Sequence, residues 1–254
     1  MRTWGKRLLL LLIAGLLIAV AGFFYWALNP LPAMPEAEAA LQSDTNVHVE
    51  TTPWFTFIPQ TSQPRLGFIL YPGGHVDPRA YAPPARRLAE EGWLVVIPPM
   101  PLNLAFFAPN KAEEIIAAHP EIEVWVIGGH SLGGAMAVRF ARTHPQQVAG
   151  LVLWASYPAE SDAIADWTDF PVLSIYGTED GGREGIEASA QLLPPETEWV
   201  VIEGGNHAQF GWYGPQPGDG VARISREEQQ AIILEATARF LHAVAAQHGV
   251  ETAP

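Results

Sequence analysis

Residues 124–134, VWVIGGHSLGG, run from a dense apolar block into a small-residue turn with Ser131 at its centre. The apolar block indicates a buried strand, and residues 132–143 after the turn indicate a helix. The turn has the pattern G-x-S-x-G, with Gly129 and Gly133 on either side of the serine. Such a strand–turn–helix unit holds a serine hydroxyl out above a sheet, and its strained backbone tolerates only very small neighbours. Ser131 is therefore a candidate nucleophile; the alternative is a helix-capping serine in a glycine-rich turn.

The chain around this turn alternates between strand-like and helical patterns. Strands are expected at residues 54–58, 66–71, 93–99, 123–129, 148–156, 171–177 and 197–205, and helices within residues 78–92, 104–118, 132–143 and 225–247. Near-continuous apolar strands separated by helices are typical of a parallel sheet covered on both faces. We therefore predict an α/β fold whose ligand site lies beyond the carboxyl ends of the strands.

A serine is a poor nucleophile without a base and an acid that orients the base. In this type of turn the chain order is serine, acid, histidine. His207 directly follows the last expected strand, which places it at the same edge of the sheet as Ser131. The acid is expected after the preceding strand, where Asp180 is the first choice and Glu179 the runner-up.

An oxyanion needs two N–H donors, and the backbone of Leu132, directly after the nucleophile, is the first. The second is expected in the loop YPGG at residues 71–74, with Gly73 as the first choice because glycine lets the backbone approach a substrate closely. Further contacts with the substrate are predicted for Gly74, Trp212 and Tyr213.

The motifs YPGG, GGHSLGG, YGTEDG and GGNH occur in this order. In this combination the chain resembles the α/β-hydrolase superfamily across roughly residues 50–247, and looks most like the small bacterial branch related to dienelactone hydrolases. Those hydrolases use a cysteine nucleophile, whereas this chain has no cysteine, so their substrate does not carry over. The resemblance implies cofactor-free hydrolysis of a carboxylic ester by a serine triad. The short segment at residues 157–170 leaves little room for a large cap over the site.

Other functions stay open at this point. The same triad suits thioester, lipid or peptide acyl groups, and a catalytically idle hydrolase fold would serve as a binding module. His75 and Asp77 are a weak pair of metal ligands without partners, so no metal site is predicted. The net charge of −13 disfavours nucleic-acid binding, because an acidic body repels polyphosphate.

The N-terminus differs from the rest of the chain. Arg2, Lys6 and Arg7 precede an uncharged apolar run over residues 8–28, which as a helix would span roughly 30 Å, enough to cross a bilayer. The run is longer than the apolar part of most cleaved signal peptides. We predict an uncleaved single-pass anchor with its basic end in the cytoplasm. The alternative is secretion after cleavage near residues 37–39.

The predicted organisation has three parts. Residues 1–28 form a short cytoplasmic stub and the transmembrane anchor. Residues 29–50 are rich in proline, alanine and glutamate and are predicted to be a tether. Residues 51–250 form the hydrolase domain on the outer side, whose expected substrate is a small-molecule or lipid ester.

Overall fold

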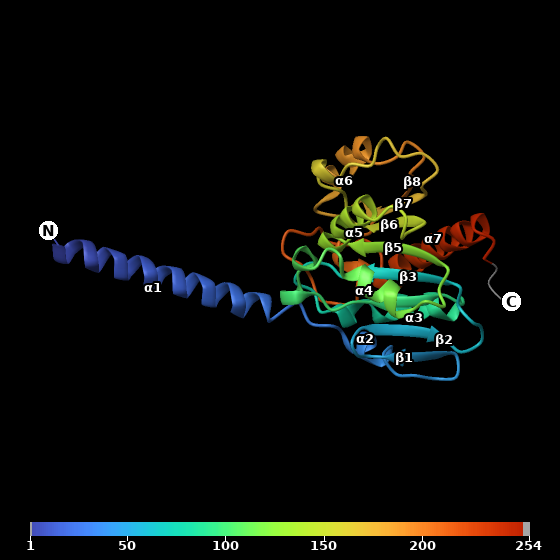
Figure 1. The fold of residues 1–254 in the computed structure, drawn as a ribbon, viewed down its shortest axis with the longest axis horizontal. Helices are drawn as coiled ribbons and strands as arrows, with labels where there is room; N and C mark the ends of the chain where they lie inside the picture. The colour runs from blue at the N-terminus through green and yellow to red at the C-terminus, as the bar shows by residue number, and fades with distance from the viewer. Residues whose placement is uncertain (1, 251–254) are drawn as a thin grey trace.

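The computed structural model describes residues 2–250. A long N-terminal helix leads into an α/β domain built on one eight-stranded sheet (Figure 1). The strands are β1 (Val47–Glu50), β2 (Phe55–Pro59), β3 (Leu66–Tyr71), β4 (Leu94–Ile97), β5 (Val124–His130), β6 (Gly150–Trp154), β7 (Val172–Gly177) and β8 (Glu198–Ile202). The helices are α1 (Arg2–Ala27), α2 (Pro35–Ala39), α3 (Ala82–Glu90), α4 (Lys111–Ala118), α5 (Leu132–Thr143), α6 (Arg183–Ala188) and α7 (Arg226–Gln247).

The strands lie in the order β1-β2-β4-β3-β5-β6-β7-β8. Strands β3 to β8 are parallel to one another, and β2 is antiparallel to both of its neighbours. Residues 155–171 link β6 to β7 with a single short 3-10 turn and no large cap. The fold class predicted from the sequence, a mostly parallel sheet with helices on both faces, is confirmed.

Alternate strand residues face two separate cores, as side chains on a pleated strand must. In β3, Phe68 and Leu70 belong to the core covered by α3 and α7. Ile69 and Tyr71 belong to the opposite core, which α4 and α5 cover. Both cores consist mainly of fully buried side chains, so the sheet is a rigid platform for the loops that leave its edges.

The central strands end in register. Tyr71 at the end of β3 pairs with Gly129 in β5, and His130 at the end of β5 pairs with Trp154 at the end of β6. The loops after β3, β5, β6 and β7 therefore leave the sheet side by side at its carboxyl edge, where ligands of open α/β sheets bind.

The helix predicted over residues 104–118 is shorter than expected, since α4 begins only at Lys111. Leu102 and Asn103 have left-handed backbone angles, and Ala105–Phe107 form a separate 3-10 turn. Ala108 has non-helical backbone angles (φ −145°, ψ 57°), because the ring of Pro109 disfavours helical angles in the residue before it.

Residues 29–50 are not the tether that their composition predicts. They pack on the domain: Leu31 pairs with Val76, Ala33 pairs with Tyr213, and Ala37 in α2 is fully buried. Strand β1, also within this range, extends the sheet beside β2. The sheet therefore begins before the predicted domain boundary at residue 51.

Candidate active site

Ser131 occupies the sharp turn between β5 and α5. Its φ of 52° and ψ of −123° lie in a region that non-glycine residues rarely adopt, and such strain is typical of functional sites. Two contacts hold this backbone in place. The N–H of Ser131 donates to the carbonyl of Trp154 at 3.0 Å, and the hydroxyl of Ser156 donates to the carbonyl of Ser131 at 2.6 Å.

Steric restriction requires glycine at both positions that flank Ser131 in the turn. A Cβ on Gly129 would lie 2.4 Å from the carbonyl carbon of Gly133, and one on Gly133 would lie 2.3 Å from the carbonyl oxygen of Tyr71. Both obstacles are backbone atoms, which cannot rotate away as the end of a side chain can. The turn therefore excludes larger residues at these positions, for the reason inferred from the sequence.

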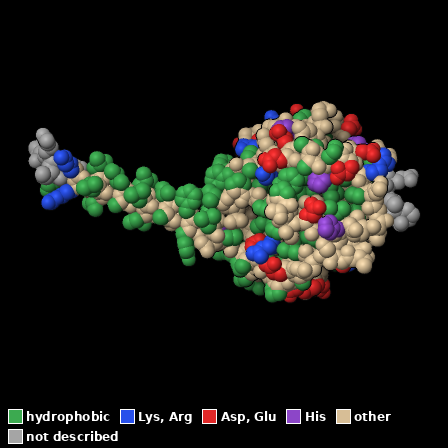
Figure 2. Space-filling view, turned by 60° about the horizontal axis from the view of Figure 1, so that its bottom comes forward, with side chains coloured by type: hydrophobic (Ala, Val, Ile, Leu, Met, Phe, Trp, Pro, Cys, Tyr) green, Lys and Arg blue, Asp and Glu red, His purple; other side chains and the backbone are tan. Residues whose placement is uncertain are grey.

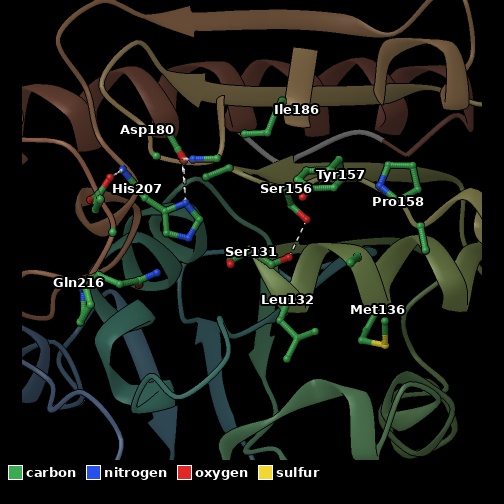
Figure 3. Close-up of a pocket in the computed structure, with 18 residues that line it drawn as sticks. Ser131, Leu132, Met136, Ser156, Tyr157, Pro158, Asp180, Ile186, His207 and Gln216 are labelled. Atoms are coloured by element: carbon green, nitrogen blue, oxygen red, sulfur yellow. Dashed lines mark hydrogen bonds and ion pairs between the residues drawn. The ribbon is translucent and has the colours of Figure 1, made fainter. Parts of the chain in front are cut away.

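His207 follows β8, and Asp180 follows β7. The Nδ1 atom of His207 lies 3.0 Å from Oδ2 and 3.2 Å from Oδ1 of Asp180, whose side chain is buried. The Nε2 atom of His207 is buried without a hydrogen-bond partner among residues 2–250. Figure 3 shows the imidazole ring between Asp180 and Ser131. The structure thus brings the three predicted triad residues to one place.

All three residues line a single cavity of about 530 Å³. One wall is largely apolar, with side chains from α5, from the loop after β6 and from α6. These side chains are Leu132, Ala135, Met136, Tyr157, Pro158 and Ile186 (Figure 3). A cavity of this size and lining suits a small or medium organic ligand with one polar reacting group.

Asp219 is a residue of the site that the sequence analysis missed. Its carboxylate accepts hydrogen bonds from the backbone N–H groups of His207 at 3.0 Å and Ala208 at 2.8 Å, and it lines the cavity. It thereby fixes the backbone of the histidine that Asp180 orients through its ring. The only signal in the sequence is the turn-forming GDG after His207, which indicates a loop and not a partner.

Glu179, the runner-up for the acid, points elsewhere. Its carboxylate pairs with Arg223 at 2.5 Å and lies 3.2 Å from the hydroxyl of Thr178. Asp180 is therefore the acid beside His207.

Gly73 does not meet the requirement for an oxyanion donor. Its N–H donates to the hydroxyl of Tyr81 at 3.0 Å in a buried position. A donor that already has a partner is not available to a substrate, so the prediction for Gly73 is wrong for this conformation. The neighbouring Gly74 packs against the side chain of Leu132, since a Cβ on it would lie 3.0 Å from that side chain.

The Tyr81 hydroxyl also contacts His130, whose ring is fully buried and lies 4.5 Å from the ring of His207, centroid to centroid. Burial first, and the adjacent His207 second, lower the pKa of His130 well below its usual value, and a contact with the backbone of His207 opposes them. Burial raises the pKa of Tyr81. Both side chains are therefore neutral at physiological pH.

The two aromatic residues predicted to touch substrate lie outside the cavity. Tyr213 is fully buried, and its hydroxyl donates to the side chain of Gln216, which does line the cavity. Trp212 lines a different cleft, between α3 and α7. Trp212 lies against α3 and α7, and Tyr213 pairs with Ala33, so nearness in sequence to the base did not predict nearness to the substrate.

Among residues 2–250, no group of three or more His, Asp or Glu side chains could hold a metal ion. His75 instead stacks on Trp26, and Asp77 pairs with Arg79.

Solved structures of low sequence identity share the fold. The esterase domain of a Rhodothermus marinus protein superposes with a TM-score of 0.57 at 15% identity, covering 75% of this chain and 92% of that one. A CIB-like hydrolase from Thermoplasma acidophilum gives a TM-score of 0.55 at 14% identity, covering 76% and 98%. An S-formylglutathione hydrolase from Agrobacterium tumefaciens gives 0.53 at 13%, covering 80% and 98%.

One curated relative matches over a short stretch. The pimeloyl-[acyl-carrier protein] methyl ester esterase of Photorhabdus laumondii is 43% identical over 67 residues, which are 26% of this chain and 23% of that protein. A family model described as "Alpha/beta hydrolase family" matches residues 67–231. That match spans more than half of the chain, including the serine turn, Asp180 and His207, and the chain therefore belongs to the alpha/beta hydrolase family.

Proposed function

We propose that this chain is a serine hydrolase that cleaves a carboxylic ester through an acyl-enzyme. One observation carries the proposal: His207 is oriented by Asp180 through Nδ1, while its buried Nε2 is unpartnered among residues 2–250 in the cavity that Ser131 lines. A base in this arrangement has one nitrogen fixed and the other free to accept a proton.

In the proposed reaction the hydroxyl oxygen of Ser131 attacks the ester carbonyl carbon, and its proton moves to Nε2 of His207. The carboxylate of Asp180 holds the tautomer and stabilises the imidazolium that forms. His207 then gives the proton to the leaving alcohol. A water molecule, deprotonated by the same histidine, hydrolyses the acyl-Ser131 ester, so no cofactor takes part.

The oxyanion is assigned to two backbone donors at the same edge of the sheet. Leu132 supplies the first from the N-terminus of α5, where free N–H groups and the helix dipole favour negative charge. We assign the second to Gly74 in place of Gly73. The Gly74 N–H has no hydrogen-bond partner within the described chain, and the residue packs directly on Leu132.

The relatives support an ester as substrate. The curated relative acts, by its name, on a methyl ester, and a structural neighbour is an esterase domain. The apolar wall of the cavity would hold the acyl or alcohol part, with Met136 and Ile186 at its sides.

The test is labelling with a fluorophosphonate probe together with hydrolysis of p-nitrophenyl esters of graded chain length. Ser131→Ala is expected to abolish labelling and to lower kcat by about 10⁴-fold or more. Ser156→Ala is the matched control, because this second serine lines the same cavity but uses its hydroxyl to hold the Ser131 carbonyl. It should keep probe labelling. A folded protein that ignores both the probe and every ester would refute the hydrolase and favour the binding module.

We further propose that α1 is an uncleaved membrane anchor. Within residues 6–27, an 18-residue stretch has a mean hydropathy of 2.7, and none of it is buried in the domain. Ala27 is fully buried, and the chain that follows packs on the domain, so the helix end belongs to the folded structure. By the positive-inside rule, Arg2, Lys6 and Arg7 favour a cytoplasmic N-terminus.

Two measurements test the anchor. The mass of the membrane-extracted protein should include residues 1–28. Because the chain has no cysteine, a single Gln147→Cys variant allows a clean topology test. A membrane-impermeant maleimide should label it in intact cells if the domain lies outside. A mature protein that begins after residue 39 would instead mean secretion.

A further inference from the structure

The end of α1 is docked on the domain by specific contacts. The ring of Trp26 stacks on that of His75, with centroids 4.1 Å apart and planes inclined by 16°. The Nε2 atom of His75 lies 2.8 Å from the carbonyl of Trp26, and the side chain of Asn103 donates to the carbonyl of Ala27 at 2.8 Å. These bonds fix the helix against the domain, whereas a flexible linker would leave it free to turn.

The docking residues belong to the edge of the sheet that carries the serine. His75 follows β3 and Asn103 follows β4, so both lie at the carboxyl edge, where Ser131 follows β5. Gly74 lies between the docking loop and the cavity: a Cβ on it would lie 3.5 Å from Leu104 in that loop and 3.0 Å from Leu132, which lines the cavity. In Figure 1, α1 extends away from this edge in roughly the direction of the strands.

Around this junction the surface is apolar. We define the rim as the exposed side chains Tyr25, Trp26, Leu28, Phe106 and Phe107. Phe106 is 57% exposed and Phe107 48% exposed, although both are large apolar side chains. Figure 2 shows hydrophobic side chains continuing from the helix onto the adjoining part of the domain.

The segments that build this region lack charged residues. Residues 27–35 and 98–110, which build the junction and the loop of the two phenylalanines, contain no Asp, Glu, Lys or Arg. The rest of the domain is strongly acidic, since the chain carries 27 acidic and 14 basic residues. An anionic lipid surface would not attract such a body, so contact with a bilayer has to come from apolar side chains.

We infer that the rim lies in the interfacial layer of the bilayer that α1 crosses, so that the cavity opens at the membrane surface and takes an amphiphilic ester from that bilayer. Residues 6–27 would cover roughly 33 Å, about the thickness of the hydrocarbon core. Tyr25 and Trp26 then lie at the interface, where aromatic side chains are favoured, and Phe106 follows three residues after Asn103, which bonds the end of α1. The choice of substrate rests on the proposed ester hydrolysis; the placement of the rim does not.

The placement is tested with the full-length chain in phosphatidylcholine vesicles. Phe106→Cys introduces a lone thiol for an environment-sensitive nitrobenzoxadiazole label. Gln147→Cys is the matched control, because this exposed residue precedes β6 at the opposite edge of the sheet. The label at position 106 should emit at shorter wavelength than that at 147 and be quenched by lipids with a spin label near the headgroup. Equal emission and no quenching at position 106 would overturn the inference.

The substrate class is tested in the same vesicles with two esters, a soluble p-nitrophenyl acetate and a long-chain fluorogenic ester dissolved in the bilayer. The double variant Phe106→Ser/Phe107→Ser is expected to lower the rate on the bilayer ester about tenfold, since an apolar contact is lost, and to leave the acetate rate unchanged. Val201→Ser, at an exposed apolar residue of β8, should change neither rate. Equal rates for wild type and double variant on the bilayer ester would refute the substrate class.

The outcomes separate this inference from the proposed function. Loss of both esterase activities in the wild type, with the label at position 106 still buried in lipid, would refute the ester hydrolase and keep the membrane contact. Full acetate hydrolysis, with the label at position 106 outside the lipid, would keep the ester hydrolase and refute the membrane contact.

Discussion

The hydroxyl of Tyr81 lies 2.8 Å from Nδ1 of His130, in a fully buried position behind the candidate base. The same hydroxyl accepts the N–H of Gly73, so its own proton is free to go to the histidine nitrogen. Through this one oxygen, the loop after β3 is bonded to the turn that carries Ser131. The two sides of the proposed oxyanion site therefore have a shared support.

Tyr81→Phe removes this support without changing the shape of the core. It leaves the Gly73 N–H and the His130 ring nitrogen without their partner, so unfolding free energy should fall by about 1–3 kcal/mol. We also expect kcat on a soluble ester to fall about tenfold with little change in KM, because the loop that presents Gly74 is loosened.

Tyr71→Phe is the matched control for this loss. The Tyr71 hydroxyl also joins two backbone groups, accepting from the N–H of Ala112 and donating to the carbonyl of Pro109, but away from the site. Denaturant unfolding should show a similar loss of stability with kcat unchanged. If both variants lower kcat equally, the effect is one of general stability and Tyr81 has no special role.

The burial of His130 predicts acid sensitivity of the fold. Its pKa is lowered in the folded chain, so as pH falls below about 6.5 the unfolded chain binds a proton that the folded chain resists binding. Stability due to this group is complete above that pH and is lost as pH falls toward the folded pKa. The groups that face the ring are Tyr81, His207 and Tyr213.

His130→Gln should therefore flatten the pH dependence of stability. Between about pH 6.5 and 5, wild-type unfolding free energy should fall by up to about 1.4 kcal/mol per pH unit more than that of the variant. Urea unfolding at several pH values measures this difference. His242→Gln, at an exposed position of α7, is the comparison and should leave the wild-type slope in place. Identical slopes for wild type and His130→Gln would contradict the prediction.

Asp219→Asn tests whether the backbone of the base needs its carboxylate. The substitution replaces one of the two oxygens that accept from the N–H groups of His207 and Ala208 with a donor. A small displacement of the base should lower kcat by up to about 100-fold, with KM little changed. Glu179→Gln is the control, since that carboxylate pairs with Arg223 and leaves the histidine untouched. An unaltered kcat in Asp219→Asn would mean that this carboxylate supports the loop but does not position the base.

The parts of the fold that were predictable are those in which local pattern and tertiary position agree. Apolar runs gave β3 and β5 nearly to the residue, and the order of Ser131, Asp180 and His207 followed from which loops leave the carboxyl edge. These three residues could be predicted without side-chain positions, because the prediction used only their order in the chain and the edge of the sheet at which each loop lies.

The features that were missed depend on contacts between distant segments. Asp219 reaches His207 only because the loop returns to the site, and Gly73 loses its free N–H to Tyr81, a side chain from another element. Residues 29–50 have the composition of a linker, yet Ala37 and the residues of β1 find apolar partners on the domain. A local sequence pattern cannot show these partners, because they come from distant parts of the chain.

Gly133→Ala puts the steric account of the serine turn to a direct test. The added methyl would lie 2.3 Å from the carbonyl oxygen of Tyr71, and backbone on both sides prevents relief. We expect the variant to be recovered mainly as unfolded protein, or to have a much lower melting temperature and no probe labelling at Ser131. Gly214→Ala is the matched control, because nothing lies within 4 Å of a Cβ at that position. It should keep the wild-type melting temperature and labelling. If Gly133→Ala folds and is labelled like the control, the turn has more room than these contacts allow, and the glycines of the G-x-S-x-G pattern need another explanation.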